Sequence, residues 1–316
     1  MTAHKNRKRL VRARAQRTGE SYTAALQHLR SAQTEPVGVF GYPRVPHEGR
    51  SILRRYQALL DEQLPGRIGG LYLVGAVALG EFDHRDDQLD FIAASDAPLT
   101  EADRTTCNAI HQMVQSEFAT PALDGLYVTW EQLRAAPPRD PQTIMAWNDG
   151  RLAPADVAGY PVSKVNPVTW TTLAQHGITL RGLDARELPI HQDRAELTAW
   201  NLRNLDTYWH STARMARQIP LQAAAAFDAR KFVWAILGPP RLHYTISTGR
   251  ITTKDAAGEY ALANFPSQWH GLIRAAIAIH RGDISTFGAA TDDPFQFAIA
   301  DFIDFVVSDA RRVIDH

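Results

Sequence analysis

The sequence contains a single cysteine, Cys107, among its 316 residues. One cysteine cannot form an intramolecular disulfide or a zinc site built from several cysteines, and it is typical of a protein from a reducing compartment. No apolar run approaches the length of a membrane span, and no apolar core follows the basic N-terminus as it would in a signal peptide. The sequence therefore predicts a cytoplasmic protein.

The chain also lacks an excess of charge of either sign, since 34 lysines and arginines balance 34 acidic residues. No overall charge therefore draws it to nucleic acid or to a membrane surface. The first twenty positions are nevertheless crowded with basic residues: Lys5, Arg7, Lys8, Arg9, Arg12, Arg14 and Arg17. We predict a basic, helical N-terminal extension over residues 1–34. It is either an arm that binds nucleic acid or a protein partner, or a solvated tail.

Residues 35–48 contain prolines and glycines and are predicted to be a linker. Residues 49–186 alternate between helical and strand patterns, which predicts an α/β (α+β) domain with helices on a small mixed sheet. The expected helices cover residues 50–63 and 100–118, and the expected strands cover 71–74, 89–94, 125–129 and 178–180. The proline-rich stretch 135–166 shows no clear period and is predicted to be one long connection.

Residues 187–316 show only helical patterns, which predicts an all-α helical bundle. Thr253 and Ser267 each precede a helical stretch and are predicted to be its N-cap. Pro239 and Pro240 fall inside another helical stretch. They are predicted to break or kink that helix, because proline removes a backbone donor and clashes with the preceding turn.

The stretch from Leu71 to Ala94 carries the main candidate site. It reads as a strand, a glycine turn at Gly75, a short helix and a second strand with an acid, Asp90, near its start. The first turn of such a helix presents N–H groups that bind phosphate oxygens. An acid at the mouth of an otherwise apolar strand needs a functional reason, because burying a charge is costly. The stretch therefore predicts a site for a nucleotide and its metal.

Gly75-Ala76, followed by Gln88-Leu89-Asp90, resembles the Gly-Ser and Asp-x-Asp signature of the polymerase-beta-type nucleotidyltransferases. The stretch from Arg241 to Ala261 resembles the C-terminal helical domain of the aminoglycoside adenylyltransferases that modify streptomycin and spectinomycin. The resemblance implies a nucleotidyltransferase domain followed by a helical-bundle domain. It also implies transfer of AMP from ATP, with Mg²⁺, to a hydroxyl of a small aminoglycoside-type acceptor, and hence antibiotic resistance.

The resemblance also implies roles for particular residues. The nucleotide-binding residues would be Gly75, Ala76, Arg241, Lys254 and His280. Asp90 and Asp124 would be the catalytic acids, and the metal ligands would be Asp90, Asp87 and Gln88. Asp228 is the candidate contact to the acceptor.

Several positions depart from the family pattern. These are Ala76 for a serine, Gln88 for the first metal carboxylate, Tyr127 for the catalytic glutamate, Lys231 for the acid that grips the aminoglycoside, and His280 for a phosphate-contacting tyrosine. Asp87 would supply the missing carboxylate only if a bulge turned it inward, since in a regular strand it faces away from Asp90. Asp124 would need a shifted strand register to serve as the catalytic acid in place of Tyr127. Lys231 would repel a polycationic drug.

These residues are compatible with three functions. The first is an active ATP-dependent nucleotidyltransferase with a changed acceptor. The second is a nucleotide-binding protein of the same fold that has lost turnover and has a regulatory or partner-binding role. The third is an interaction protein in which the basic extension binds a partner and the fold is a passive scaffold, which would make that binding strongly dependent on salt.

Overall fold

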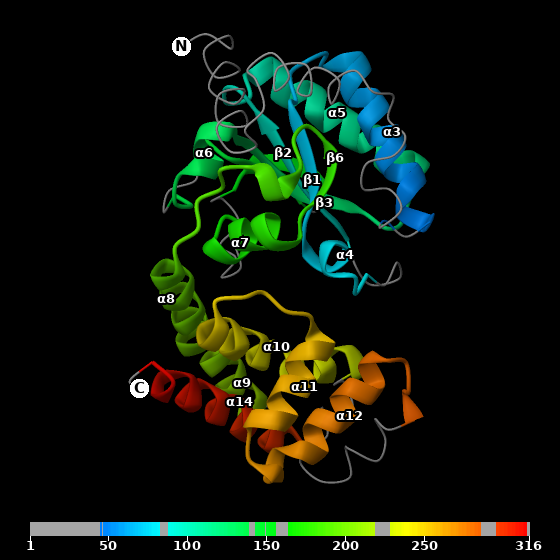
Figure 1. Ribbon diagram of the computed structural model, residues 1–316. Helices are drawn as coiled ribbons and strands as arrows, with labels where there is room; N and C mark the ends of the chain where they lie inside the picture. The colour runs from blue at the N-terminus through cyan, green and yellow to red at the C-terminus, as the bar shows by residue number, and fades with distance from the viewer. Residues whose placement is uncertain are drawn as a thin grey trace. The chain divides into compact units, whose positions relative to one another are not determined.

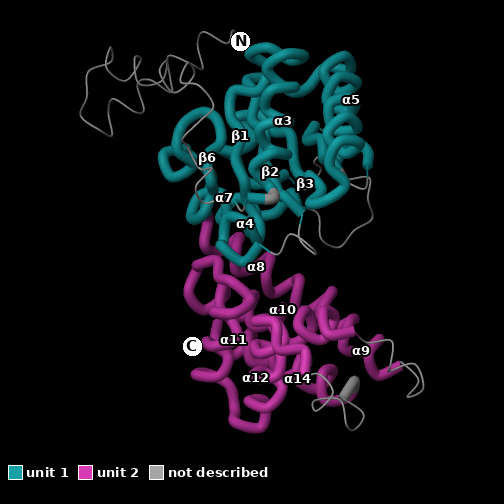
Figure 2. Tube along the Cα trace, turned by 90° about the vertical axis from the view of Figure 1, so that its right-hand side faces the viewer, with its two compact units in different colours: residues 1–192 teal, residues 193–316 magenta. Residues whose placement is uncertain are grey.

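The structure is a computed structural model that describes residues 45, 47–82, 88–138, 143–148, 150–155, 164–218, 228–285 and 295–314. The chain forms two compact units, residues 1–192 and residues 193–316 (Figure 2). The predictions for the basic extension over 1–34 and for most of the linker over 35–48 lie outside the described residues. Within the described ranges, no helix combines the length and the apolar character needed to cross a membrane.

Unit 1 is built on a six-stranded mixed sheet with the strand order β5-β4-β3-β2-β1-β6. The strands are β1 (Gly70–Leu73), β2 (Leu89–Ser95), β3 (Leu123–Thr129), β4 (Met145–Asn148), β5 (Arg151–Pro154) and β6 (Ile178–Arg181). Among these described strands, β2 and β3 run parallel and every other neighbouring pair is antiparallel. The predicted mixed sheet is confirmed.

Helices cover both faces of this sheet (Figure 1). They are α3 (His47–Gln63), α4 (Gly75–Leu79), α5 (Glu101–Glu117), α6 (Trp130–Arg134) and α7 (Pro167–His176), with a 3₁₀ turn η2 (Ala185–Glu187). On one face, α3 and α5 form a core with Leu71 and Leu73 of β1. On the other face, α6, α7 and η2 pack against Tyr72 and Ile92. The two cores follow from the strand period, because successive side chains of β1 point to opposite faces.

The stretch 135–166 is not one long connection, contrary to the prediction. It contains β4 and β5, which pair as an antiparallel hairpin in which Asn148 lies opposite Arg151. Each strand has only four residues, too few for an alternating pattern to be recognised. Pairing of β4 with β3 stabilises the hairpin, and a contact of that kind is not visible in the local sequence.

Unit 2 is an all-α bundle, as predicted. Its elements are α8 (Arg194–Asn204), a π-helical segment η3 (Leu205–Trp209), α9 (His210–Gln218), α10 (Ala229–Thr248), α11 (Lys254–Asn264), a 3₁₀ turn η5 (Ser267–Trp269), α12 (His270–His280) and α14 (Phe295–Arg312). Helix α10 is the central element, since it contacts α8, α11, α12 and α14 (Figure 1).

Two helix boundaries in unit 2 differ from the predictions. Helix α10 is not broken at Pro239 and Pro240 but continues through them, and both prolines are buried, so packing against the surrounding helices offsets the lost backbone hydrogen bonds. Ser267 is not an N-cap but the first residue of η5, because Pro266 with its fixed φ takes the cap position. Thr253 does cap α11, as predicted, by accepting a hydrogen bond from a first-turn N–H.

Candidate functional site

Asp90 and Asp124 lie side by side on the two parallel strands. Each is the second residue of its strand, and the two are direct register partners in the β2–β3 ladder. Equivalent positions of paired strands point to the same face, so both carboxylates emerge on the α7 side of the sheet. The predicted need for a shifted register is therefore wrong. Strand β3 begins at Leu123, earlier than its predicted start at Gly125, and this earlier start places Asp124 in regular pairing.

Lys164 lies between these two carboxylates. Its Nζ is 2.8 Å from Oδ2 of Asp124 and forms a second, short ion pair with Oδ1 of Asp90. The side chain of Asp124 is 7% exposed, that of Asp90 24% and that of Lys164 32%. Burial would by itself lower the pKa of Lys164, but Asp90 and Asp124 outweigh burial and raise that pKa above its ordinary value. The ammonium is therefore charged, and we call these three residues the ion triad.

No pattern in the sequence indicates a role for Lys164. It lies in the part of the chain that was predicted to be a long connection, directly after residues 156–163, which are outside the described residues. A lysine in such a segment is ordinarily a surface charge. Lys164 could have been expected only once Asp90 and Asp124 were known to be neighbours. Two neighbouring carboxylates that are partly buried need a cation to compensate their charge.

The turn at Gly75 packs directly on Asp90. Gly75 has φ +64°, and a Cβ atom at this position would clash with Oδ2 of Asp90. The backbone N–H of Val74 donates to the carbonyl oxygen of Asp90 over 2.9 Å. The structure thus brings together Gly75 and Asp90, the two strongest candidates of the first unit.

Tyr127 faces away from the ion triad. It lies three positions after Asp124 on β3, so the strand period turns it to the opposite face of the sheet, where its ring belongs to the α3–α5 core. Its hydroxyl is 2.6 Å from the hydroxyl of Tyr56 and 2.7 Å from Nε2 of His111. Burial raises the pKa of Tyr127 well above its ordinary value. Tyr127 is therefore a core residue.

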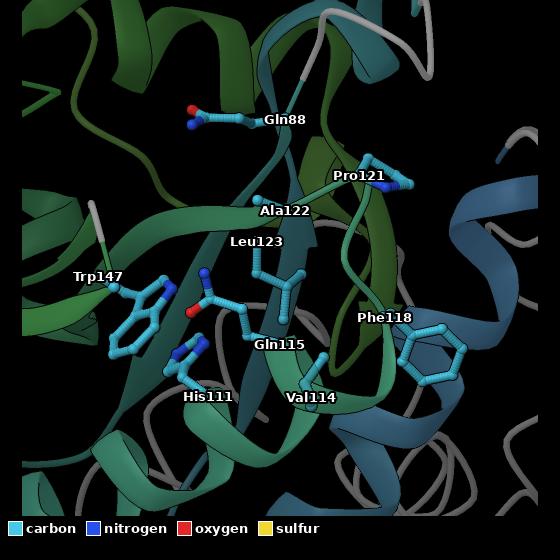
Figure 3. Close-up of a pocket in the computed structure, with 10 residues that line it drawn as sticks. Gln88, His111, Val114, Gln115, Phe118, Pro121, Ala122, Leu123 and Trp147 are labelled. Atoms are coloured by element: carbon cyan, nitrogen blue, oxygen red, sulfur yellow. The ribbon is translucent and has the colours of Figure 1, made fainter.

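Gln88 lines a pocket of about 210 Å³ on the α5 side of the sheet (Figure 3). His111 and Gln115 project into this pocket from α5, and Trp147 of β4 lies beside His111 with the ring centroids 4.2 Å apart and the planes within 7°. Gln88 precedes β2 and its side chain is exposed. Asp87, another of the three predicted metal ligands, lies outside the described residues.

In unit 2 the predicted nucleotide-binding residues gather around the start of α11. Lys254 is the first residue of that helix. Arg241 of α10 donates from Nε to the carbonyl of residue 252 over 3.2 Å, just before Lys254. His280 ends α12, and its neighbour Arg281 forms an ion pair of 2.8 Å with Asp255 in the first turn of α11. The structure therefore brings Arg241, Lys254 and His280 to one end of the bundle.

Asp228 has a structural task at the start of α10. It is the N-cap residue, and its Oδ1 accepts a hydrogen bond of 2.8 Å from the backbone N–H of Lys231. The Nζ of Lys231 is 3.9 Å from the other carboxylate oxygen. The carboxylate predicted to hold a cationic acceptor thus has a cation of the same chain beside it.

The described residues do not fit the divalent ion that the resemblance implies. No group of three or more His, Cys, Asp or Glu side chains suited to a metal occurs among them. Asp90 and Asp124, the two acids that do lie together, already hold Lys164. An ammonium and a divalent ion repel each other strongly at contact distance, so they cannot share the space between two carboxylates.

Comparison with known proteins bears on the fold of both units. Residues 206–294 match the family model of the aminoglycoside adenylyltransferase C-terminal domain. Among solved structures, the chain is similar to spectinomycin adenyltransferase AAD(9) from Enterococcus faecialis, crystallised with ATP and spectinomycin. The TM-score is 0.55 at 13% sequence identity, over 82% of this chain and 98% of that chain. A comparison with curated protein sequences found no match. The predicted fold is confirmed, and residues 206–294 of unit 2 are similar to the C-terminal domain of the aminoglycoside adenylyltransferases.

Proposed function

We propose that this adenylyltransferase-like chain binds ATP and transfers its AMP group to a hydroxyl of a small acceptor. One observation carries the proposal: Asp90 and Asp124 form a register pair beside the Gly75 turn, on the face of the sheet opposite the α3–α5 core. Carboxylates in such a place supply the base that a hydroxyl nucleophile needs. The match of residues 206–294 to the C-terminal domain of aminoglycoside adenylyltransferases supports the same activity.

Asp90 is the better placed of the two acids to act on the acceptor. In the reaction the acceptor oxygen bonds to the α-phosphorus, the bond from that phosphorus to the pyrophosphate oxygen breaks, and the hydroxyl proton leaves to a base. The Asp90 side chain is 24% exposed and that of Asp124 only 7%, so Asp90 is the one that an acceptor can reach. Asp124 positions Asp90 through the shared Lys164.

The phosphates of ATP need cationic and N–H partners, because the reaction is promoted mainly by positioning and charge neutralisation. In unit 1 we assign such a task to the backbone at Gly75 and Ala76. In unit 2, taken by itself, we assign it to the side chains of Arg241, Lys254 and His280. The location of the last three residues around the start of α11 supports the assignment. No step is assigned to Mg²⁺, since the residues described here do not fit it.

The acceptor should carry fewer positive charges than streptomycin. Asp228, the candidate acceptor contact, is an N-cap with Lys231 beside it. A cationic ring amine brought to this place would meet the ammonium of Lys231, and like charges at contact distance repel. We therefore infer a hydroxylated acceptor with at most a few amines, and we keep antibiotic resistance as one hypothesis for its biological role.

A second function, nucleotide binding without transfer in a regulatory or partner-binding role, is favoured by one observation. Lys164 offsets the negative charge of the only acid pair described in the site, and this charge is what would otherwise hold a catalytic metal ion. Such a protein would bind ATP and release no pyrophosphate.

One experiment separates these functions. ATP binding is measured by calorimetry, and pyrophosphate release is followed over a panel that includes spectinomycin, streptomycin and hydroxylated monoamines. Release with one acceptor, lost in Asp90→Asn but kept in Asp96→Asn, supports transfer. Asp96 is an exposed acid just past the other end of β2, which makes it the matched control. Binding without release supports the second function, and the absence of ATP binding overturns both.

A further inference from the structure

We propose that Lys164 takes the place of a divalent cation between Asp90 and Asp124, so that this site works without a bound metal. Neighbouring strands lie about 4.8 Å apart, so register partners bring their carboxylates close together on one face. Two such charges repel each other unless a cation lies between them. The Nζ of Lys164 contacts one oxygen of each carboxylate, as a bridging metal ion would.

The backbone around Lys164 is anchored to the rest of the unit. Val165 is buried in the core that α7 shares with the sheet. Asn166 caps α7 by accepting a hydrogen bond of 2.9 Å from the N–H of Thr169, and Pro167 begins the helix. Lys164 therefore directly precedes two residues that are held by packing and by a helix cap. This anchoring positions its ammonium group at the two aspartates. A tethered group of this kind is always present at high effective concentration, whereas a metal ion must be recruited from solution.

The oxygen atoms around this position suit an ammonium group better than a metal ion. Magnesium takes about six oxygen ligands in octahedral geometry, of which one or two are usually carboxylates and the rest are waters and substrate phosphates. The two carboxylates that could serve here already contact Lys164. Gln88, at the position of the missing carboxylate, is exposed and lines the pocket beside His111. Lysine needs only hydrogen-bond acceptors around its three N–H groups, and the two aspartates provide them.

The direct test uses Mn²⁺ alone, measured by the loss of its free electron paramagnetic resonance signal. Wild-type protein should bind no Mn²⁺ at this site. Lys164→Gln keeps most of the side-chain length and removes the charge, so it should gain Mn²⁺ affinity by tenfold or more. Adding Asp124→Asn to this variant should abolish the gain. Lys164→Arg, which keeps a cation, and Lys231→Gln, which removes an exposed lysine paired with Asp228, should both behave as wild type.

Two results of the Mn²⁺ titration would overturn the proposal. One is wild-type binding that Asp124→Asn removes and Lys164→Gln leaves unchanged, because the metal would then coexist with the lysine. The other is the absence of Mn²⁺ binding in a folded Lys164→Gln variant, because the acid pair would then not be a latent cation site.

A second measurement on unmodified protein keeps the proposal testable if Lys164→Gln fails to fold. It rests on the proposed function and compares the ATP dissociation constant in EDTA with that in millimolar Mg²⁺. A ratio within about twofold supports a metal-independent site, and a tenfold gain with Mg²⁺ overturns it. Failure to bind ATP in either buffer would overturn the proposed function, while the Mn²⁺ titration would still decide the role of Lys164.

Discussion

The carboxylate of Asp90 fills the space that a side chain at residue 75 would need. Gly75 has φ +64°, and a Cβ added there would clash with Oδ2 of Asp90. Gly80, at the other end of the same short helix, has φ +80° and open space around its Cα. The two glycines therefore share a left-handed backbone, and only Gly75 also touches the candidate site.

We expect Gly75→Ala to cost more stability than Gly80→Ala and to impair ATP binding as well. A left-handed alanine costs roughly 1–2 kcal/mol at either position. At residue 75 the displacement of Asp90 should add about 1–3 kcal/mol, as overpacking does in a filled site. Urea unfolding gives the two free energies of unfolding, and calorimetry gives the ATP affinity. Equal losses in both variants would show that Asp90 moves aside without cost.

The ion triad should behave as one coupled unit. Lys164→Met leaves two neighbouring carboxylates without their cation, and we expect it to lower the free energy of unfolding by about 3 kcal/mol. Asp124→Asn alone should cost less, because Lys164 keeps Asp90 as a partner. The double variant should lose less than the sum of the single losses, with a coupling of about 1–3 kcal/mol. Additive losses in urea unfolding would mean that the three charges are energetically independent.

Much of the architecture could be predicted from the sequence because the signals are local. The strands β1 and β2 are apolar runs with turn residues at their ends, and both were expected close to where they lie. The helix expected over residues 100–118 is also present, and Thr100 and Asp103 form a capping box at its start through hydrogen bonds of 3.2 and 2.8 Å. Residues close together in the sequence determine both the apolar strands and the helix cap.

The composition of the site could be predicted only in part, because it depends on contacts between distant segments. Nothing in the residues around Asp124 shows that β3 begins at Leu123, and a start at Gly125 leaves this acid outside the sheet. Lys164 comes from a stretch without a period, and only the folded chain brings it to Asp90. The long helix α10 overrides the proline signal because its prolines are buried, a tertiary effect that local patterns do not record.

Acid should destabilise unit 1 through His111. This ring is buried between Phe91 and Trp147, and burial lowers its pKa to about 3 from an ordinary 6.5. The unfolded chain therefore binds a proton below pH 6.5 that the native protein does not, so stability falls as the pH falls through the window from 6.5 toward 3. The slope from this group reaches about 1.4 kcal/mol per pH unit.

The variant His111→Phe isolates this contribution. It keeps an aromatic ring beside Trp147 but cannot be protonated, and it gives up the hydrogen bond to Tyr127. We expect it to be less stable than wild type at neutral pH and to show a shallower decline of the urea midpoint between about pH 6.5 and pH 4.5. Parallel declines in the two proteins would assign the acid sensitivity to other groups.

Cys107 should report on unfolding of unit 1. Its side chain is fully buried on α5, and burial raises the pKa of its thiol to about 12. Since the thiolate is the reactive form, we expect no reaction with a disulfide reagent at pH 8 until urea unfolds the unit. Ser116→Cys in a Cys107→Ala background places a thiol at an exposed position of the same helix and should react at once. Rapid labelling of native wild type would reveal local opening of α5.

Gly238 lies directly before the two prolines of α10 and packs against Trp209, because a Cβ there would overlap the ring of Trp209. Gly271 in α12 has open space around its Cα. We therefore expect Gly238→Ala to lower the stability of unit 2 by about 1–3 kcal/mol, the usual effect of overpacking. Gly271→Ala should raise it by up to about 1 kcal/mol, because alanine is the better helix former. Chemical denaturation followed by tryptophan fluorescence compares the two. A gain in both variants would mean that helix propensity outweighs the overlap with Trp209.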